Sequence, residues 1–309
     1  MVMKNRMQNI LVTGGAGFVG SNLIKRLKAD YPAARIVSLD NYMSGSSDNH
    51  VSGVEYYHGH TMDAHLIFED LEVPFDTVFH FGEYSRIVQS FEDIQIASDS
   101  ILVGTPRILE LCRHWDAKLI YSASSSKFGN DGKDENLAPY SWMKAKMVEL
   151  IKNYGEWYGL EYQINYFFNV YGPNQITKGD YATVVGIFER QFNNGEKCTV
   201  VSPGTQSRDF THVDDIVNGV VKSTEYLYTA LEEDQTEIGR EWFLRSGVSR
   251  TIIEVAEMFG EWEFIPERKG ERQHSATVDN GTNEKLGLNP TDKLEEWINS
   301  VKNLQKVNA

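Results

Sequence analysis

The chain has 309 residues, of which 41% are apolar and 24% charged, and this composition excludes disordered, collagen-like and membrane-spanning proteins. Because 44 acidic side chains outnumber 30 basic ones, the net charge of −14 repels phosphate backbones and anionic lipids, so we expect neither nucleic acid nor a membrane as partner. Cys112 and Cys198 are too few for a disulfide framework and lack neighbours spaced as zinc ligands, so we expect no metal site and a reduced, cytoplasmic setting.

Short apolar runs alternate with helical patterns along the first half of the chain. The runs cover residues 10–13, 36–39, 77–81, 119–122 and 163–168, and between them apolar residues recur at helical spacing, as at Val19, Leu23 and Leu27. Strands that are apolar along their whole length indicate a parallel sheet with helices on both faces. The sequence therefore predicts an α/β fold with a Rossmann-type doubly wound parallel sheet.

The alternation becomes less regular after about residue 170, where Gly and Pro separate shorter elements. This change predicts a smaller mixed α/β lobe at the C-terminal end that binds substrate. We expect the Rossmann domain to comprise residues 1–170 with a returning segment at about 207–245. The substrate lobe then comprises residues 171–206 and 246–309.

A glycine-rich turn follows the first strand and leads directly into a helical pattern. Its glycines, Gly14, Gly17 and Gly20, are of the kind that lets backbone amides approach a pyrophosphate at the positive end of a helix. Asp40 closes the second strand 20 residues after Gly20, where a carboxylate can accept hydrogen bonds from both ribose hydroxyls of an adenosine and would repel a 2′-phosphate. The sequence therefore predicts NAD rather than NADP, held by Gly14, Ala16, Gly17, Phe18, Val19, Gly20, Asp40 and Asn41.

Tyr140 and Lys144 lie four residues apart in a helical stretch, so they share one face of that helix. An ammonium beside a phenol favours the phenolate, and we expect Lys144 and a positively charged nicotinamide to lower the pKa of Tyr140. Ser124, near the end of the strand at 119–122, can hydrogen-bond the same substrate oxygen. These three residues are the predicted catalytic group, and Tyr140 and Lys144 are also predicted to contact the cofactor.

Together these motifs resemble the extended short-chain dehydrogenases/reductases, in particular the NAD-dependent nucleotide-sugar epimerases and dehydratases similar to UDP-glucose 4-epimerase. The resemblance extends over most of the chain through HFG at 80–82, SASSSKFG at 122–129, FNVYGP at 168–173, GTQSRDFTHVDD at 204–215 and RKGE at 268–271. It implies a nucleoside-diphosphate sugar as substrate, with Asn169, Arg208 and Arg268 on the diphosphate. It further implies cofactor contacts at Asp63, Phe81 and Gly82 and substrate contacts at Glu83, Ser85, Arg86, Ser124 and Ser125. For Glu83 and Arg86, pairing with each other is an equally open interpretation.

Several positions depart from the family pattern, and one of them narrows the reaction. Relatives that dehydrate the sugar carry an acid directly after the residue equivalent to Ser124, whereas this chain has Ser125 and Ser126 there. The pattern therefore favours a nucleotide-sugar 4-epimerase that oxidises C4 transiently. The alternative is a 4-dehydrogenase that releases the 4-keto sugar; a 4,6-dehydratase and a non-catalytic dinucleotide-binding protein are less favoured. His60 and Ile101 also differ from the usual aspartate and asparagine.

The resemblance also implies a homodimer, because related enzymes pack two helices of each subunit into a four-helix bundle. Candidate helices lie within residues 94–115 and 141–158. Their apolar residues cover more of the helix surface than one core-facing stripe needs, which leaves apolar surface for a partner.

Overall fold

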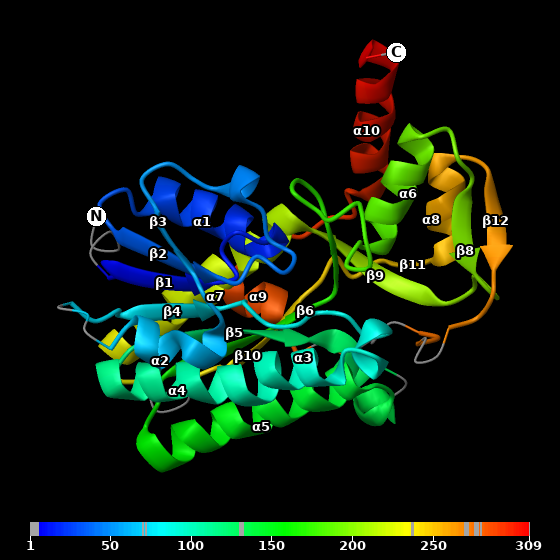
Figure 1. The fold of residues 1–309 in the computed structure, drawn as a ribbon. Helices are drawn as coiled ribbons and strands as arrows, with labels where there is room; N and C mark the ends of the chain where they lie inside the picture. Colours follow the sequence, from blue (N-terminus) through cyan, green and yellow to red (C-terminus); the bar gives the residue numbers. More distant parts are fainter. Residues whose placement is uncertain are drawn as a thin grey trace.

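A seven-stranded, wholly parallel sheet forms the larger part of the computed structural model, which describes residues 6–69, 71, 73–129, 133–235, 238–268, 272–274, 278 and 280–308. The strand order is β10-β6-β5-β4-β1-β2-β3 (Figure 1). Its strands are β1 (Asn9–Thr13), β2 (Arg35–Asp40), β3 (Glu55–His58), β4 (Thr77–His80), β5 (Lys118–Ser124), β6 (Tyr162–Phe167) and β10 (Glu241–Leu244). The predicted Rossmann-type doubly wound fold is confirmed.

Helices cover both faces of this sheet (Figure 1). One face carries α1 (Phe18–Asp30) and α7 (Val213–Glu232); the other carries α2 (Ala64–Ile67), α3 (Ile94–Ser98), the π-helical turn η5 (Asp99–Val103), α4 (Gly104–Trp115) and α5 (Pro139–Tyr158). Alternate residues of β1 reach opposite faces, because Ile10 and Val12 join the core with Leu23, whereas Leu11 joins the core with Ile108. This double burial explains why the strand has an uninterrupted apolar run.

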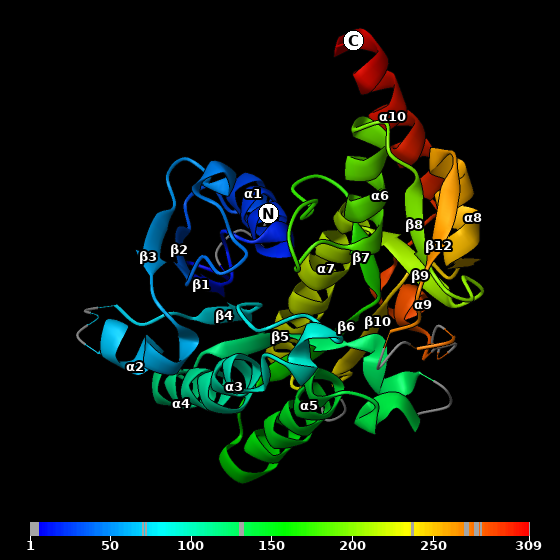
Figure 2. The same ribbon diagram turned by 45° about the vertical axis from the view of Figure 1, so that its right-hand side comes forward.

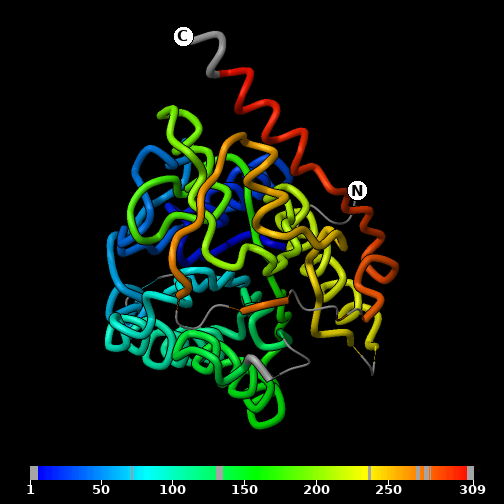
Figure 3. The backbone as a smooth tube through the Cα atoms, turned by 90° about the vertical axis from the view of Figure 1, so that its right-hand side faces the viewer, coloured from blue at the N-terminus to red at the C-terminus, as the bar shows by residue number. Residues whose placement is uncertain are grey.

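A smaller lobe lies beside the carboxyl ends of the strands (Figure 2). It contains the sheet β11-β9-β7, formed by β7 (Asn169–Tyr171), β9 (Ser207–His212) and β11 (Ser249–Thr251), and the pair β8 (Cys198–Val201) and β12 (Trp262–Ile265). The helices α6 (Val184–Asn193), α8 (Ile252–Phe259) and α10 (Leu294–Asn308) pack around a third core cluster, and α9 (Thr282–Leu286) contacts α7. Figure 3 shows the orange segment of β12 returning beside the green segment of β8.

The strand boundaries differ from the sequence prediction in ways that bear on the site. β5 continues to Ser124, so this hydroxyl stands on the last residue of the strand rather than beyond it. β3 was not predicted because its residues, Glu55 to His58, are mostly polar and exposed at the sheet edge. The segment 207–245 contributes β10 to the large sheet and α7 to one of its faces, while its first strand, β9, belongs to the smaller sheet. The division into domains stays a prediction. In the described part of the chain, no helix has the length and apolarity needed to cross a membrane.

Candidate active site

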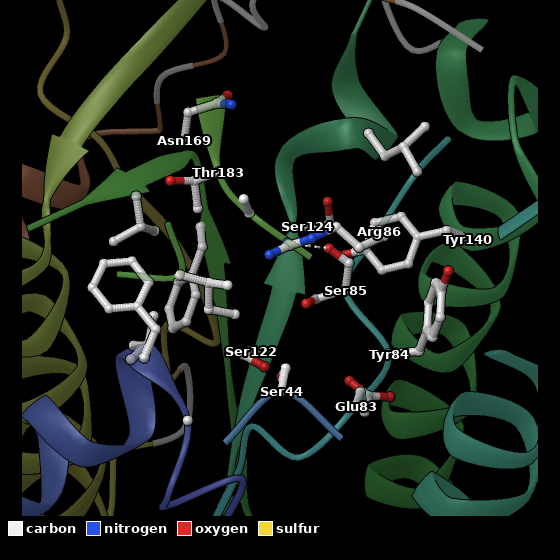
Figure 4. A pocket seen from close by; sticks show the side chains of 18 of the residues that line it. Ser44, Glu83, Tyr84, Ser85, Arg86, Ser122, Ser124, Tyr140, Asn169 and Thr183 are labelled. Atoms are coloured by element: carbon white, nitrogen blue, oxygen red, sulfur yellow. Dashed lines mark hydrogen bonds between the residues drawn. The ribbon is translucent and has the colours of Figure 1, made fainter. Parts of the chain in front are cut away.

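A cavity of about 480 Å³ lies at the carboxyl ends of the parallel strands, between the large sheet and the smaller lobe. Gly14 after β1, Asp40 at the end of β2, Gly82 after β4 and Ser124 at the end of β5 line it from the sheet side. Arg208 of β9 lines it from the lobe. Figure 4 shows the part of the cavity around Ser124 and Tyr140. Chain segments distant in sequence therefore meet at one edge of the sheet, where parallel-sheet proteins bind ligands.

Gly14, in the turn after β1, and Gly20, in the first turn of α1, have no room for a side chain. A Cβ atom on Gly20 would lie 2.1 Å from the Gly14 carbonyl oxygen, and one on Gly14 would lie 2.8 Å from the backbone of Gly82. Gly14 also has a φ of +74°, which favours glycine. The first residue before α1 is Gly17, no side chain caps the helix, and its first turn contains no acid. The positive end of α1 therefore opens onto the cavity as an anion cradle.

Asp40 is fixed beside this cradle. Its carboxylate accepts the Ala16 N–H at 2.9 Å and the Tyr42 N–H at 2.8 Å, and the residue is only 7% exposed. Burial raises the pKa of Asp40, and the amide hydrogen bonds partly offset this effect. The cradle and the adjacent acid fit NAD: they would hold its pyrophosphate and its adenosine ribose.

Tyr140 and Ser124 meet on the opposite wall (Figure 4). Pro139 starts α5, and the Tyr140 N–H donates to the Ser90 hydroxyl at 3.2 Å, which anchors the first turn of the helix. The Ser124 side chain lies beside Tyr140 in the cavity wall and acts on the pKa of the phenol. Burial raises the pKa of Tyr140 to about 12; Ser124 and Arg86 lower it, and Glu83 raises it further. Within the chain, burial outweighs the groups that lower this pKa, and the lowering expected from a positively charged nicotinamide stays a prediction.

Lys144 pairs with Glu83. Both side chains are buried, at 5% and 3% exposure, and the ammonium also donates to the Ser122 carbonyl at 2.5 Å. Burial lowers the pKa of Lys144, while Glu83 raises it and so partly compensates. The alternative pairing of Glu83 with Arg86 is not what the structure contains. Glu83 turns toward α5, whereas Arg86 lies beside Tyr140 and Tyr181.

A hydrogen-bonded chain connects this ion pair to the cradle. The Thr105 hydroxyl donates to Glu83 at 2.6 Å, and His80 Nε2 lies 3.0 Å from the same Thr105 oxygen. His80 Nδ1 lies 2.8 Å from the Thr13 hydroxyl, which accepts the Gly82 N–H at 2.9 Å. Burial lowers the pKa of His80 to about 4, so the ring is neutral at pH 7. Because Thr105 uses its hydrogen toward Glu83, His80 donates from Nε2 and accepts at Nδ1.

The predicted substrate residues Glu83, Ser85, Arg86, Ser125, Asn169, Arg208 and Arg268 all line the cavity. Arg208 is buried and Arg268 exposed, and Lys269 to Glu271 of the same motif lie outside the described residues. Arg272, which the sequence motifs did not indicate, is buried in the cavity wall and donates to the Ser125 carbonyl at 3.2 Å. The sequence around it has no helical or strand periodicity, so no sequence signal indicated it.

The predicted cofactor residues Gly14, Gly17, Phe18, Val19, Gly20, Asn41, Phe81 and Gly82 also line the cavity, together with Asp40. Ala16 and Asp63 are not part of its wall. Ala16 is fully buried behind the cradle and reaches Asp40 through its amide. Asp63 ends the single turn η3 (Thr61–Asp63), in which Thr61 takes the inward position. His60 caps this turn by accepting the Met62 N–H, as an aspartate can.

The Rossmann sheet, the amide cradle with Asp40, and Tyr140 and Lys144 on one helix define an NAD-dependent enzyme of the short-chain dehydrogenase type. Comparison with known proteins places it further: the chain belongs to the NAD dependent epimerase/dehydratase family, which it matches over residues 10–239.

Three relatives illustrate the range of this family. A putative UDP-glucose 4-epimerase of Methanocaldococcus jannaschii is 30% identical over 97% of this chain and 99% of its own. UDP-glucuronic acid decarboxylase 6 of Arabidopsis thaliana is 29% identical over 94% of this chain and 86% of its own. The crystal structure of UDP-glucose 4-epimerase with UDP-glucose from Thermotoga maritima is similar with a TM-score of 0.85 at 25% identity, covering 98% of this chain and 100% of that one. The comparisons therefore establish an NAD-dependent enzyme among nucleotide-sugar epimerases, decarboxylases and dehydratases.

Proposed function

We propose that this enzyme is a nucleotide-sugar 4-epimerase that oxidises C4 of a nucleoside-diphosphate sugar and then reduces it from the opposite face. The observation that carries the proposal is that Tyr140 and Ser124 lie together in the cavity wall across from the cradle, and that two buried serines follow Ser124 in the chain. Bound NAD supplies the acceptor, and later the donor, of the C4 hydride. Relatives named as 4-epimerases support the same reaction class.

The chain's own residues have the chemistry that proton transfer requires. Tyr140 takes the proton of the 4-hydroxyl and returns it, and Ser124 orients that hydroxyl by bridging it to the phenol. Tyr140 must be a phenolate to take this proton, and because burial raises its pKa, the oxidation step should still quicken as pH rises above neutral. Lys144 holds the cofactor from α5 and is itself held by Glu83.

The diphosphate is assigned to the lobe side of the cavity. Arg208 and Arg268 provide guanidinium groups that match phosphate oxygens, and Asn169 adds an amide donor. With the diphosphate anchored there, the sugar ring can turn between the two hydride transfers without leaving the site. This assignment, the cytoplasmic location and the homodimer remain predictions.

Ser125 and Ser126 argue against the dehydratase reaction. Elimination of the C6 hydroxyl requires an acid that protonates the leaving oxygen, and these two buried side chains provide only hydroxyls at this position. We therefore expect the product to keep all atoms of the substrate.

A substrate panel tests this proposal. Purified enzyme is incubated with UDP-, GDP-, CDP- and dTDP-sugars, and product stereochemistry at C4 is read by NMR. Inversion at C4 without loss of mass is the expected result. A product lighter by one water, or a released 4-keto sugar, would contradict the epimerase assignment.

A further inference from the structure

Arg86 brings a positive charge to the catalytic end of the cavity. It stands in the irregular segment after β4 and lines the cavity beside Ser124 and Tyr140 (Figure 4). Its Nη1 donates to the Ser85 carbonyl at 2.8 Å, and its Cζ lies 5.8 Å from the centre of the Tyr181 ring. Its Nε is shielded from solvent and has no hydrogen-bond partner. The guanidinium is therefore only partly satisfied by the protein.

Neighbouring acids in the described part of the chain are engaged elsewhere. Glu83 pairs with Lys144, and Asp93 accepts the hydroxyls of Tyr84 at 3.0 Å and Tyr181 at 3.3 Å. Burial lowers the pKa of Arg86, and the groups that raise it are Tyr140, Tyr84 and Tyr181. A shielded N–H donor on a cation that lacks an anion is costly, and an anionic ligand group would relieve that cost.

The position of Arg86 determines which part of a ligand it can meet. The charged side chains that act on the Tyr140 phenol are Glu83 and Arg86, whereas Arg208 belongs to β9 and Arg268 follows β12 in the other lobe. Arg86 therefore lies near the part of the ligand that contains the reacting carbon, and not near the diphosphate. If Tyr140 takes the 4-hydroxyl proton, an anion beside it must be attached close to C4, and a hexose can carry one as the C6 carboxylate on the adjacent C5.

We propose that the sugar is a uronic acid and that Arg86 binds its C6 carboxylate as the specificity-determining residue. This inference rests on the proposed C4 oxidation. A guanidinium offers two parallel N–H donors to a carboxylate, and the free Nε is one half of such a fork. A neutral hexose leaves that donor without an anion.

Binding of the carboxylate has a consequence for the reaction. Oxidation at C4 places a ketone two carbons from the carboxylate, and such a β-keto acid can break its C5–C6 bond. The electron pair of that bond would form the enolate across C4 and C5, CO₂ would leave, and C5 would then take up a proton. Two donors on the carboxylate hold its charge in place and disfavour this loss, so the carboxylate is retained and the 4-epimer forms.

The test measures kcat/KM for UDP-glucuronate and UDP-galacturonate against UDP-glucose and UDP-galactose, in the wild type and in Arg86→Met. The wild type should prefer the uronates. Arg86→Met should reduce this preference by roughly 10- to 100-fold, the size expected for losing charge-assisted hydrogen bonds, and Arg86→Lys should recover part of it. Arg113→Met, an exposed arginine on α4 paired with Glu110, is the matched control and should keep the preference.

Calorimetric titration supplies a readout independent of turnover. Arg86→Met should weaken binding of UDP-glucuronate while UDP binds as in the wild type. A wild type that prefers neutral hexoses overturns the carboxylate inference. It is also overturned if Arg86→Met lowers kcat/KM equally for neutral and acidic sugars and shifts the pH profile of kcat/KM to higher pH. In both cases C4 inversion still stands. Release of CO₂ from a uronate would instead support the carboxylate contact and refute the epimerase function.

Discussion

Glu83→Gln tests the buried ion pair at the centre of the site. The substitution keeps the size of the side chain but leaves the Lys144 ammonium without its counter-charge. Both side chains are at most 5% exposed, so water cannot replace the lost carboxylate. Removing one partner of a buried pair costs about 3–5 kcal/mol, and because glutamine still offers an oxygen, we expect about 3 kcal/mol.

Urea unfolding followed by tryptophan fluorescence measures this loss as a lower midpoint. The control is Glu149→Gln on α5, the helix that carries Lys144. Glu149 pairs with Lys146 at 2.8 Å, but the two side chains are 52% and 35% exposed, so losing this pair should cost under about 1 kcal/mol. Equal midpoints for the two variants would refute the reasoning.

The pH dependence of the Glu83→Gln deficit gives a second readout. Burial lowers the pKa of Lys144, and Glu83 raises it, so the variant lowers this pKa further. A lysine whose folded pKa lies below its unfolded value of about 10.4 destabilises the protein while it is protonated, and stability recovers as pH rises toward that value. The deficit of the variant should therefore shrink between neutral pH and pH 10. A constant deficit would contradict this explanation.

Three further predictions concern the cofactor, the base and assembly. Asp40→Ala should weaken NAD binding and reduce the preference for NAD over NADP, with both affinities measured by titration. Equal affinities of the wild type for NAD and NADP would refute the role assigned to Asp40. Tyr140→Phe should reduce turnover by roughly 10² to 10⁴ while NAD still binds, and near-normal turnover would exclude Tyr140 as the base. Sedimentation equilibrium should find a dimer, since Ile94, Ile96 and Trp142 are exposed on the helices predicted to pair; a monomer at micromolar concentration would contradict this.

The features that the sequence predicted well depend on short-range spacing. A glycine turn between a strand and a helix, and a tyrosine four residues before a lysine, have their geometry set within a few residues. Gly14, Gly20, Tyr140 and Lys144 accordingly line one cavity, and their roles toward cofactor and substrate stay predictions. The doubly wound sheet was predictable for a similar reason, because strands buried on both faces have uninterrupted apolar runs.

The features that were missed depend on contacts between distant segments. Glu83 lies 61 residues from Lys144, so local spacing suggested Arg86, three residues away, as its partner instead. The turn after β4 directs Glu83 toward α5, and only the folded sheet brings the two side chains together. Arg272 likewise reaches Ser125 across 147 residues. The raised pKa of Tyr140 also needed the structure, since burial is its main cause.

Following the C4 hydride tests the epimerase function most directly. Purified enzyme is supplied with a saturating substrate from the panel and no added NAD, while C4 stereochemistry and NADH absorbance are recorded together. An epimerase returns every hydride to the sugar, so many turnovers with little lasting NADH absorbance are predicted. Conversion that stops after one turnover per site, with stable NADH absorbance and renewed conversion on addition of NAD, would contradict the account and identify a 4-dehydrogenase.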